Sequence, residues 1–187
     1  MRKEIRIAGF GGQGVALAGM VLGKALTLYE NLEAVMTQAY GPEARGGASS
    51  ANVVLSDLPI AYPFVQNADV LVALSQEGYS KFRPATQADA AILIDEELVI
   101  PCEGDAVFAI PATRMAEEIG PRMVANMVML GFFTAVTGLV RPENMQRAIE
   151  TSVKANTIPL NLQAFNAGHQ YGLSHYSNPT LLKEQTT

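Results

Sequence analysis

The feature that most constrains this chain is a cluster of glycines close to its beginning. Residues 4–8 alternate polar and apolar side chains, which is typical of a strand, and the run GFGGQG follows at residues 9–14. From Val15 to Tyr29, apolar residues recur at helical spacing. The sequence therefore predicts a strand, a glycine loop and a helix in succession, the unit with which a Rossmann-like α/β fold begins.

The glycine loop has the chemistry of an anion site. It matches the pattern G-x-G-x-x-G, in which glycines let the backbone turn sharply and let a ligand approach closely. The first turn of the following helix offers N–H groups and a partial positive charge, so a phosphate is the natural ligand. Gly11, Gly12, Gln13 and Gly14 are the candidate binding residues. The same glycines also suit a tight turn with nothing bound, and the pattern alone leaves both readings open.

A nicotinamide dinucleotide is disfavoured as the ligand. That version of the motif needs a carboxylate about 20 residues further on, at the end of the second strand, to hold the ribose. The second strand predicted here covers residues 33–40 and ends in Gln38-Ala39-Tyr40, with Glu33 at its opposite end. A different phosphate-bearing ligand, or a ligand held by another chain, fits the sequence better.

A second loop, residues 40–47, follows that strand and is rich in glycine with one proline. The carboxyl end of a strand in an open α/β sheet is where ligands bind, so this loop is expected beside the glycine loop. Arg45 is its one cation and suits a phosphate or carboxylate. Glu43 either pairs with Arg45 or accepts a hydrogen bond from a ligand hydroxyl. An ordinary surface ion pair between the two is an equally good reading.

The rest of the chain predicts one α/β domain with a helical C-terminal part. Apolar runs predict strands near residues 49–55, 70–74, 90–94 and 106–110, and the first half reads as a parallel, doubly wound sheet. Helical patterns follow at residues 113–119, 122–136, 143–154 and 160–171. Asn126, inside the most apolar of these helices, is either a satisfied core amide, which is the commoner case, or a donor to a ligand or to the glycine loop. We expect a single domain over residues 1–172 and a polar tail over 173–187.

Composition excludes several classes of function. The chain is 49% hydrophobic and 17% charged, which suits a globular protein, and its net charge is −5 without a basic run, so nucleic-acid binding is set aside. Residues 123–136 are too short a stretch to cross a membrane, and the chain opens directly into a strand, so we expect a cytoplasmic protein. Cys102 is the single cysteine, and one thiol cannot hold an iron–sulfur cluster or a zinc ion. Any redox carrier must therefore lie in another chain.

Two segments together resemble a known family. GGQG at residues 11–14, combined with TQAYGPEARGG at 37–47, resembles the gamma subunit of the 2-oxoacid:ferredoxin (or acceptor) oxidoreductases, closest to the 2-oxoglutarate or branched-chain types. The segments ADVLVAL at 68–74, NMVMLG at 126–131 and NLQAFNAG at 161–168 are similar to the same family. The resemblance covers roughly residues 3–172.

The resemblance implies one part of a multisubunit enzyme. Such an enzyme oxidatively decarboxylates a 2-oxoacid (2-oxoglutarate, a branched-chain 2-oxoacid or pyruvate), passes electrons to ferredoxin and yields an acyl-coenzyme A. Thiamine diphosphate lies between its alpha and beta subunits, iron–sulfur clusters lie in other chains including a ferredoxin-like delta subunit, and the gamma subunit binds no cofactor alone.

On this interpretation, Gly11, Gly12, Gln13 and Gly14, with Glu43 and Arg45, face the active-site entrance and contact the phosphates of coenzyme A. Two alternatives stay open at this point. One is a free-standing nucleotide-binding oxidoreductase, and the other is a purely structural assembly subunit whose loops touch only protein. The apolar helices also allow a homodimer.

Overall fold

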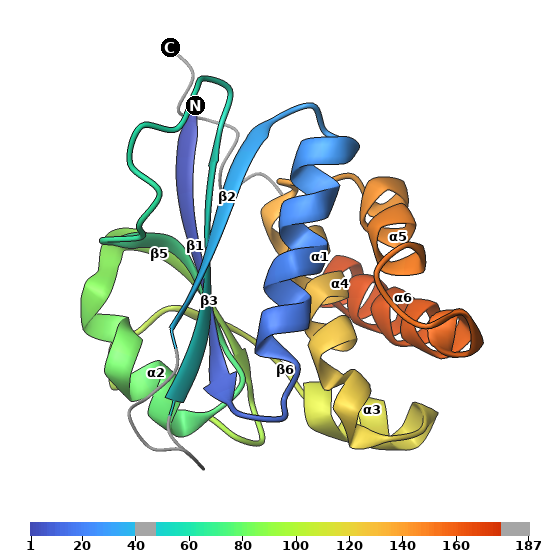
Figure 1. Ribbon diagram of the computed structural model, residues 1–187. Coiled ribbons are helices and arrows are strands. Elements are labelled where there is room, and N and C mark those ends of the chain that lie inside the picture. The colour runs from blue at the N-terminus through green and yellow to red at the C-terminus, as the bar shows by residue number, and fades with distance from the viewer. Residues whose placement is uncertain (40–47, 177–187) are drawn as a thin grey trace.

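The computed structural model describes residues 1–39 and 48–176, which form a six-stranded sheet flanked by helices. The strands, from one edge of the sheet to the other, are β2 (Glu33–Ala39), β3 (Ala48–Ser56), β1 (Arg2–Phe10), β4 (Ala68–Ala73), β5 (Thr86–Asp95) and β6 (Val107–Ile110). The helices are α1 (Val15–Leu28), α2 (Gln76–Phe82), α3 (Ala112–Ile119), α4 (Ala125–Thr137), α5 (Pro142–Glu150) and α6 (Ile158–His175). Figure 1 shows α2 on one side of the sheet and the other helices on the opposite side.

The predicted fold class is confirmed, because the chain begins β1, glycine loop, α1 and the sheet has helices on both faces. The direction of β3 differs from the parallel start that the sequence indicated: β3 runs antiparallel to both β1 and β2 and separates them. The eight residues 40–47 between β2 and β3 explain this. A connection between parallel strands needs a crossover of about a dozen residues or more. Because this connection is shorter, β3 runs antiparallel to β2.

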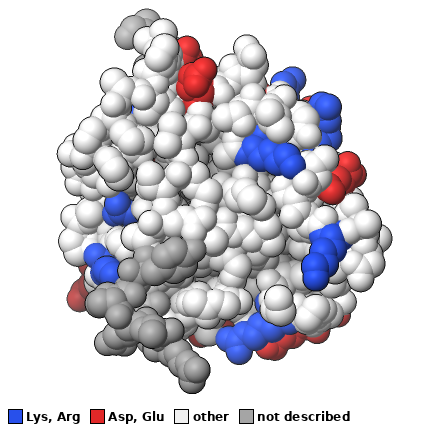
Figure 2. Space-filling model, viewed as in Figure 1, with Lys and Arg blue, Asp and Glu red and all other residues white. Residues whose placement is uncertain are grey.

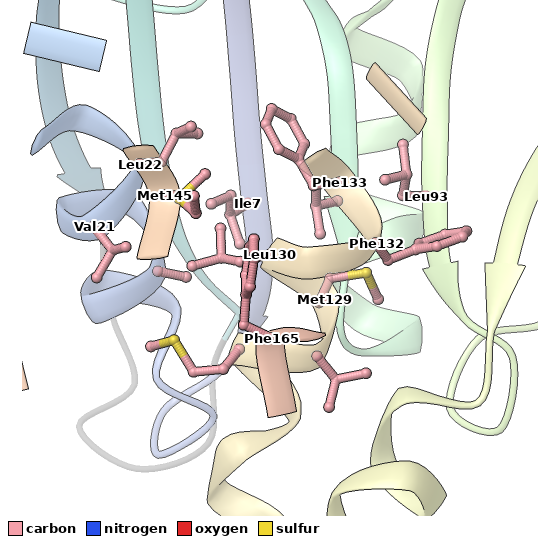
Figure 3. Packing of buried hydrophobic residues seen from close by; sticks show 14 of the residues in the cluster. Ile7, Val21, Leu22, Leu93, Met129, Leu130, Phe132, Phe133, Met145 and Phe165 are labelled. Carbon is pink, nitrogen blue, oxygen red and sulfur yellow. The ribbon is translucent and has the colours of Figure 1, made fainter. Parts of the chain in front are cut away.

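Strand alternation divides the buried side chains into two layers. Ile5 and Ile7 of β1 point toward α1 and α4, whereas Ala8 points to the other face, where Tyr79 of α2 is buried. The first layer is the larger, and Figure 3 shows Ile7 packed between side chains of α1 and α4. Both faces of the central strands are therefore covered, as their continuous apolar runs predicted.

Helix α4 is the centre of the larger layer, and all of its residues from Asn126 to Thr137 are buried. Helix α6 crosses it at very short range. A Cβ added to Gly131 would collide with the carbonyl oxygen of Phe165, and one added to Gly168 would collide with that of Val128. The two glycines therefore let the two backbones touch, which removes α4 from solvent.

Several boundaries differ from those the sequence indicated. Helix α5 stops at Glu150 rather than 154, and α6 continues to His175, beyond the expected end of the domain at residue 172. Helix α2 was not predicted, because its seven residues are too few to show a helical repeat. Residues 177–187 of the expected tail lie outside the described residues. Within the part of the chain that the structure describes, no helix has the length and apolar character needed to cross a membrane.

The close crossing predicts that Gly131→Ala strongly destabilises the fold. The added methyl group meets backbone of α6, which cannot move aside like a side chain, so we expect a loss of about 3 kcal/mol or more in the free energy of unfolding. Urea denaturation followed by circular dichroism measures it. Gln170→Ala, on an exposed position of the same helix α6, is the control and should change stability by no more than about 0.5 kcal/mol. Equal effects of the two variants would contradict the close crossing.

Candidate functional site

The glycine loop lies at the carboxyl end of β1, and its glycines serve different purposes. Gly12 and Gly14 have φ angles of 96° and 70°, in the left-handed region that favours glycine. Gly9 has no room for a side chain, since an added Cβ would lie 2.6 Å from the Oε1 atom of Gln13. Gly11 has neither a positive φ nor a neighbour, because an added Cβ would meet nothing within 4 Å. Backbone geometry thus accounts for Gly12 and Gly14, and packing for Gly9, but nothing inside the described chain accounts for Gly11.

The side chain of Gln13 forms hydrogen bonds that hold the loop in shape. Its Oε1 atom accepts a hydrogen bond from the backbone N–H of Phe10 at 2.7 Å, and its Nε2 atom donates to the carbonyl of Leu74 at 2.7 Å. Leu74 follows β4, so one amide ties the ends of two parallel strands together. Gln13 therefore shapes the loop, and any contact that it makes with a ligand comes from its backbone.

Asn126 supports the loop from α4. The residue is 3% exposed, and its Nδ2 atom donates a hydrogen bond to the carbonyl of Gly14 at 3.2 Å. Asn126 is therefore a buried, satisfied amide, and its partner is the glycine loop. A contact across more than 100 residues of sequence fixes the left-handed turn that starts α1.

The loop separates two hollows at the ligand edge of the sheet. The larger is a cleft of about 330 Å³ toward β2 and β3, which we call the outer cleft, and its described lining is Phe10, Gly11, Gly12, Gly14, Val15, Ala16, Leu17, Gln38, Ser49 and Ser50. The smaller, about 140 Å³, lies toward α3 and α4 and is lined by Gly12, Gln13, Leu74, Thr113, Arg122, Met123 and Ala125. Gly12 lines both hollows, so its backbone is the ridge between them.

Glu43 and Arg45 lie outside the described residues, so their proposed roles stay predictions. Described residues on either side of this connection line the outer cleft, however. Gln38, near the end of β2, and Ser49 and Ser50, at the start of β3, line that cleft. Ala48 pairs with Phe10 at the end of β1, which places the start of β3 beside the glycine loop.

The smaller hollow adds one cation that sequence reasoning missed. The side chain of Arg122 is 60% exposed, and its nearest carboxylate, on Glu117, is 3.9 Å away. Met123 beside it is 72% exposed. The nearby carboxylate of Asp95 is fully buried and accepts hydrogen bonds from the backbone and hydroxyl of Thr113, which anchors the start of α3. This edge therefore offers backbone amides and a guanidinium, a set of groups suited to holding an anion.

A second polar cluster lies on the α2 side of the sheet and was also missed. The hydroxyl of Tyr79 donates to the carboxylate of Asp105, Arg83 pairs with the same carboxylate, and the backbone N–H of Cys102 donates to the Tyr79 oxygen at 2.9 Å. Burial and the hydrogen bond to Asp105 raise the pKa of Tyr79 to about 12, and the hydrogen bond from Arg83 lowers the pKa of Asp105. The cluster fastens the 98–106 segment to α2.

Comparison with known proteins identifies the family. The model of the pyruvate ferredoxin/flavodoxin oxidoreductase family matches residues 4–171. The chain belongs to this family. Among its relatives is the 2-oxoglutarate synthase subunit KorC of Methanocaldococcus jannaschii, 50% identical over 91% of this chain and 94% of KorC. The ketoisovalerate oxidoreductase subunit VorA of Methanothermobacter thermautotrophicus is 38% identical over 90% of this chain, but the match covers 36% of VorA.

A solved member of the family has the same fold. The gamma subunit of the keto/oxoacid ferredoxin oxidoreductase from Geobacter sulfurreducens is 35% identical, with a TM-score of 0.85, over 93% of this chain and 98% of that one. The resemblance to the gamma subunit is therefore confirmed. The match to part of VorA adds that this domain also occurs within a longer polypeptide.

Membership in an oxidoreductase family bears on the chemistry of the described residues. In residues 1–39 and 48–176, no group of three or more histidine, cysteine, aspartate or glutamate side chains is placed to hold a metal ion. Cys102 is exposed and is not in a disulfide.

The Gln13 bridge predicts that Gln13→Glu destabilises the protein. The substitution keeps the shape of the side chain but points a carboxylate oxygen at the carbonyl of Leu74, where the amide donated. We expect a loss of about 1–3 kcal/mol in the free energy of unfolding near pH 8, measured by urea denaturation. Gln163→Glu, at an exposed position of α6, is the matched control. A Gln13→Glu variant as stable as this control would show that the bridge contributes little.

The raised pKa of Tyr79 predicts a loss of stability at high pH. Because the folded pKa, about 12, lies above the value near 10 of an unfolded tyrosine, the unfolded chain releases its proton first. The free energy of unfolding should therefore fall as the pH rises from about 10 to 12, and this fall should be smaller in Tyr79→Phe. Urea denaturation at several pH values measures it, with Tyr62→Phe, at an exposed tyrosine, as the control. An unchanged pH dependence in Tyr79→Phe would contradict the assignment.

Proposed function

We propose that this chain is the gamma subunit of a thiamine-diphosphate-dependent 2-oxoacid:ferredoxin (or acceptor) oxidoreductase, with 2-oxoglutarate as the 2-oxoacid. The similarity to KorC, 50% identical over nearly the whole of both chains, supports this substrate over the branched-chain 2-oxoacids, since the match to VorA is 38%. Similarity along the full chain also favours this function over a free-standing nucleotide-binding protein.

The redox and decarboxylation chemistry is proposed to reside in partner subunits. Thiamine diphosphate would supply carbanion stabilisation between the alpha and beta subunits, and iron–sulfur clusters would lie in chains such as a ferredoxin-like delta subunit. This chain has one cysteine, and a cluster needs several, so its own residues do not fit an iron–sulfur centre. We expect the complex in the cytoplasm.

The contribution of this chain is proposed to be the binding of coenzyme A. The observation that carries this proposal is the open space above Gly11 and Gly12, where an added Cβ would meet no neighbour within 4 Å. Both glycines lie just before α1 and line the outer cleft. Backbone N–H groups at such a position bind phosphate oxygens. Arg45 lies in sequence between Gln38 and Ser49, which both line that cleft, and we propose that it pairs with a phosphate while Glu43 accepts a hydrogen bond from a hydroxyl.

Coenzyme A binding by the assembled complex tests the proposal. We expect Arg45→Ala to raise the dissociation constant and the KM for coenzyme A about tenfold or more, because a charge-assisted contact contributes about 1.5–3 kcal/mol. Turnover at saturating coenzyme A and the KM for the 2-oxoacid should stay within about twofold. Arg147→Ala, on α5 against Tyr29, is the control.

Two other outcomes of these measurements would contradict the proposed coenzyme A contact. Unchanged affinity and KM in Arg45→Ala would overturn the coenzyme A contact. If glycine-loop variants instead failed to assemble, yet gave normal kinetics once assembled, the loop would serve only protein contacts and the chain would be a structural subunit.

A further inference from the structure

The two hollows beside the glycine loop differ in charge. The described residues that line the outer cleft include no charged side chain. The described lining of the smaller hollow includes one, the guanidinium of Arg122. The net charge of the chain is −5, and Figure 2 shows lysine and arginine side chains scattered over the face that it draws rather than gathered in one patch. Of the described residues that line either hollow, Arg122 therefore supplies the full positive charge.

The guanidinium of Arg122 is only weakly held by its partner inside the chain. An oxygen of the Glu117 carboxylate lies 3.9 Å from the Nε atom, too far for a hydrogen bond, and both side chains are more than half exposed. An exposed pair of this length contributes little to stability. The carboxylate of Asp95 is fully buried, is bound by Thr113 and is not part of the lining. Arg122 can therefore turn to a ligand and hold a phosphate with two hydrogen bonds.

The groups across the glycine loop follow one order. The outer cleft, with its uncharged described lining, comes first, the backbone ridge of the loop comes next, and the smaller hollow with Arg122 comes last. Gly12 lines both hollows, and a Cβ added to it or to Gly11 would meet nothing within 4 Å. A ligand can therefore approach the backbone of the ridge closely and reach into both hollows.

Coenzyme A has the same order of groups along its length. Its neutral pantetheine arm is joined through a pyrophosphate to a ribose that carries the 3′-phosphate. A pyrophosphate suits the backbone N–H groups of a glycine loop at the start of a helix. The 3′-phosphate is a monoester with about 1.5 to 2 negative charges at pH 7, so it gains more from a guanidinium. Dinucleotide sites follow the same rule, since an arginine accommodates the additional ribose phosphate of NADP.

We infer that coenzyme A lies across Gly12, with its 3′-phosphate bound by Arg122 in the smaller hollow and its pantetheine arm toward the outer cleft. The inference rests on the proposed function, because it names the place and the orientation of the proposed ligand. It makes Arg122 a specificity residue, which distinguishes coenzyme A from the same molecule without the 3′-phosphate. The opposite orientation would put the most highly charged group of the ligand into the cleft whose described lining is uncharged.

Calorimetric titration of the assembled complex with coenzyme A and with 3′-dephospho-coenzyme A tests the inference. We expect Arg122→Gln to raise the dissociation constant for coenzyme A about fivefold or more, because a charge-assisted contact is lost. For dephospho-coenzyme A, the variant and the wild type should agree within about twofold. Arg114→Gln is the matched control: Arg114 is an exposed arginine of α3 that pairs with Glu97 and does not line the hollow, so its variant should bind both ligands as the wild type does.

A second variant separates a ligand contact from a structural role of the ion pair. Glu117→Gln breaks the same pair but keeps the guanidinium, so coenzyme A should bind at least as tightly as it binds the wild type. A loss of affinity as large as that of Arg122→Gln would show that the pair itself matters, and it would overturn the inference. An Arg122→Gln variant that weakens both ligands equally, or neither, would overturn it as well.

The same two ligands distinguish a failure of this inference from a failure of the proposed function. If Arg45→Ala weakens coenzyme A but not dephospho-coenzyme A, whereas Arg122→Gln weakens neither, the 3′-phosphate is bound by Arg45. The orientation inferred here is then wrong, and the proposed function stands. Unchanged affinity for both ligands in both variants would overturn the inference together with the proposed coenzyme A contact.

Discussion

The side-chain amide of Gln13 connects the end of β1 to the end of β4, and the ligand edge of the sheet is organised around that connection. One end of the amide holds the N–H of Phe10 and the other holds the carbonyl of Leu74. The loop is thereby drawn against Leu74, which explains why Gly9 has no space for a side chain. With Asn126 holding the carbonyl of Gly14 from α4, the turn is fixed from both sides. Gly11 and Gly12 are left as the exposed part of a rigid loop.

This rigidity matters for a site made of backbone groups. A flexible glycine loop would lose conformational entropy on binding an anion, whereas a loop already fixed by hydrogen bonds loses little. The side chains that fix the loop, Gln13 and Asn126, are neutral amides. They therefore neither form an ion pair with Arg122 nor repel a phosphate. The same loop would also present a well-defined shape to another protein. Kinetic measurements on the assembled complex, rather than the structure, therefore distinguish a loop that binds coenzyme A from one that only contacts another subunit.

The parts of the fold that the sequence predicted are those with a local signal. The glycine loop, α1 and the apolar runs of β4 and β5 each have a pattern within a few residues, and each is found where expected. The direction of β3 has no such signal, because alternation and apolar runs are the same in either direction. Its antiparallel course follows from the length of the connection, which the sequence did contain.

The sequence likewise predicted only those parts of the candidate site that have a local signal. Gly11, Gly12 and Gly14 were predicted from a contiguous motif, but the internal use of the Gln13 side chain needed the position of Leu74, 61 residues away. Arg122 and the Tyr79–Arg83–Asp105 cluster come together only through tertiary packing, so no spacing rule could find them. Asn126 was recognised as unusual because a polar side chain in an apolar helix needs a partner, but the partner itself depended on the packing of α4.

Helix α1 and strand β2, at one edge of the sheet, carry few charged residues. A strand order that ends in β2 leaves one long edge beside a helix, and the two elements contribute only Lys24 and Glu33 as charged residues. Solubility of a monomer would favour more charge at such a place, as at most exposed helix faces. The outer cleft lies at one end of this edge, because Ala16 of α1 and Gln38 of β2 line it together with the glycine loop. The described lining of that cleft contains no charged side chain, so positive charge for an anion there must come from backbone N–H groups or from residues outside this lining.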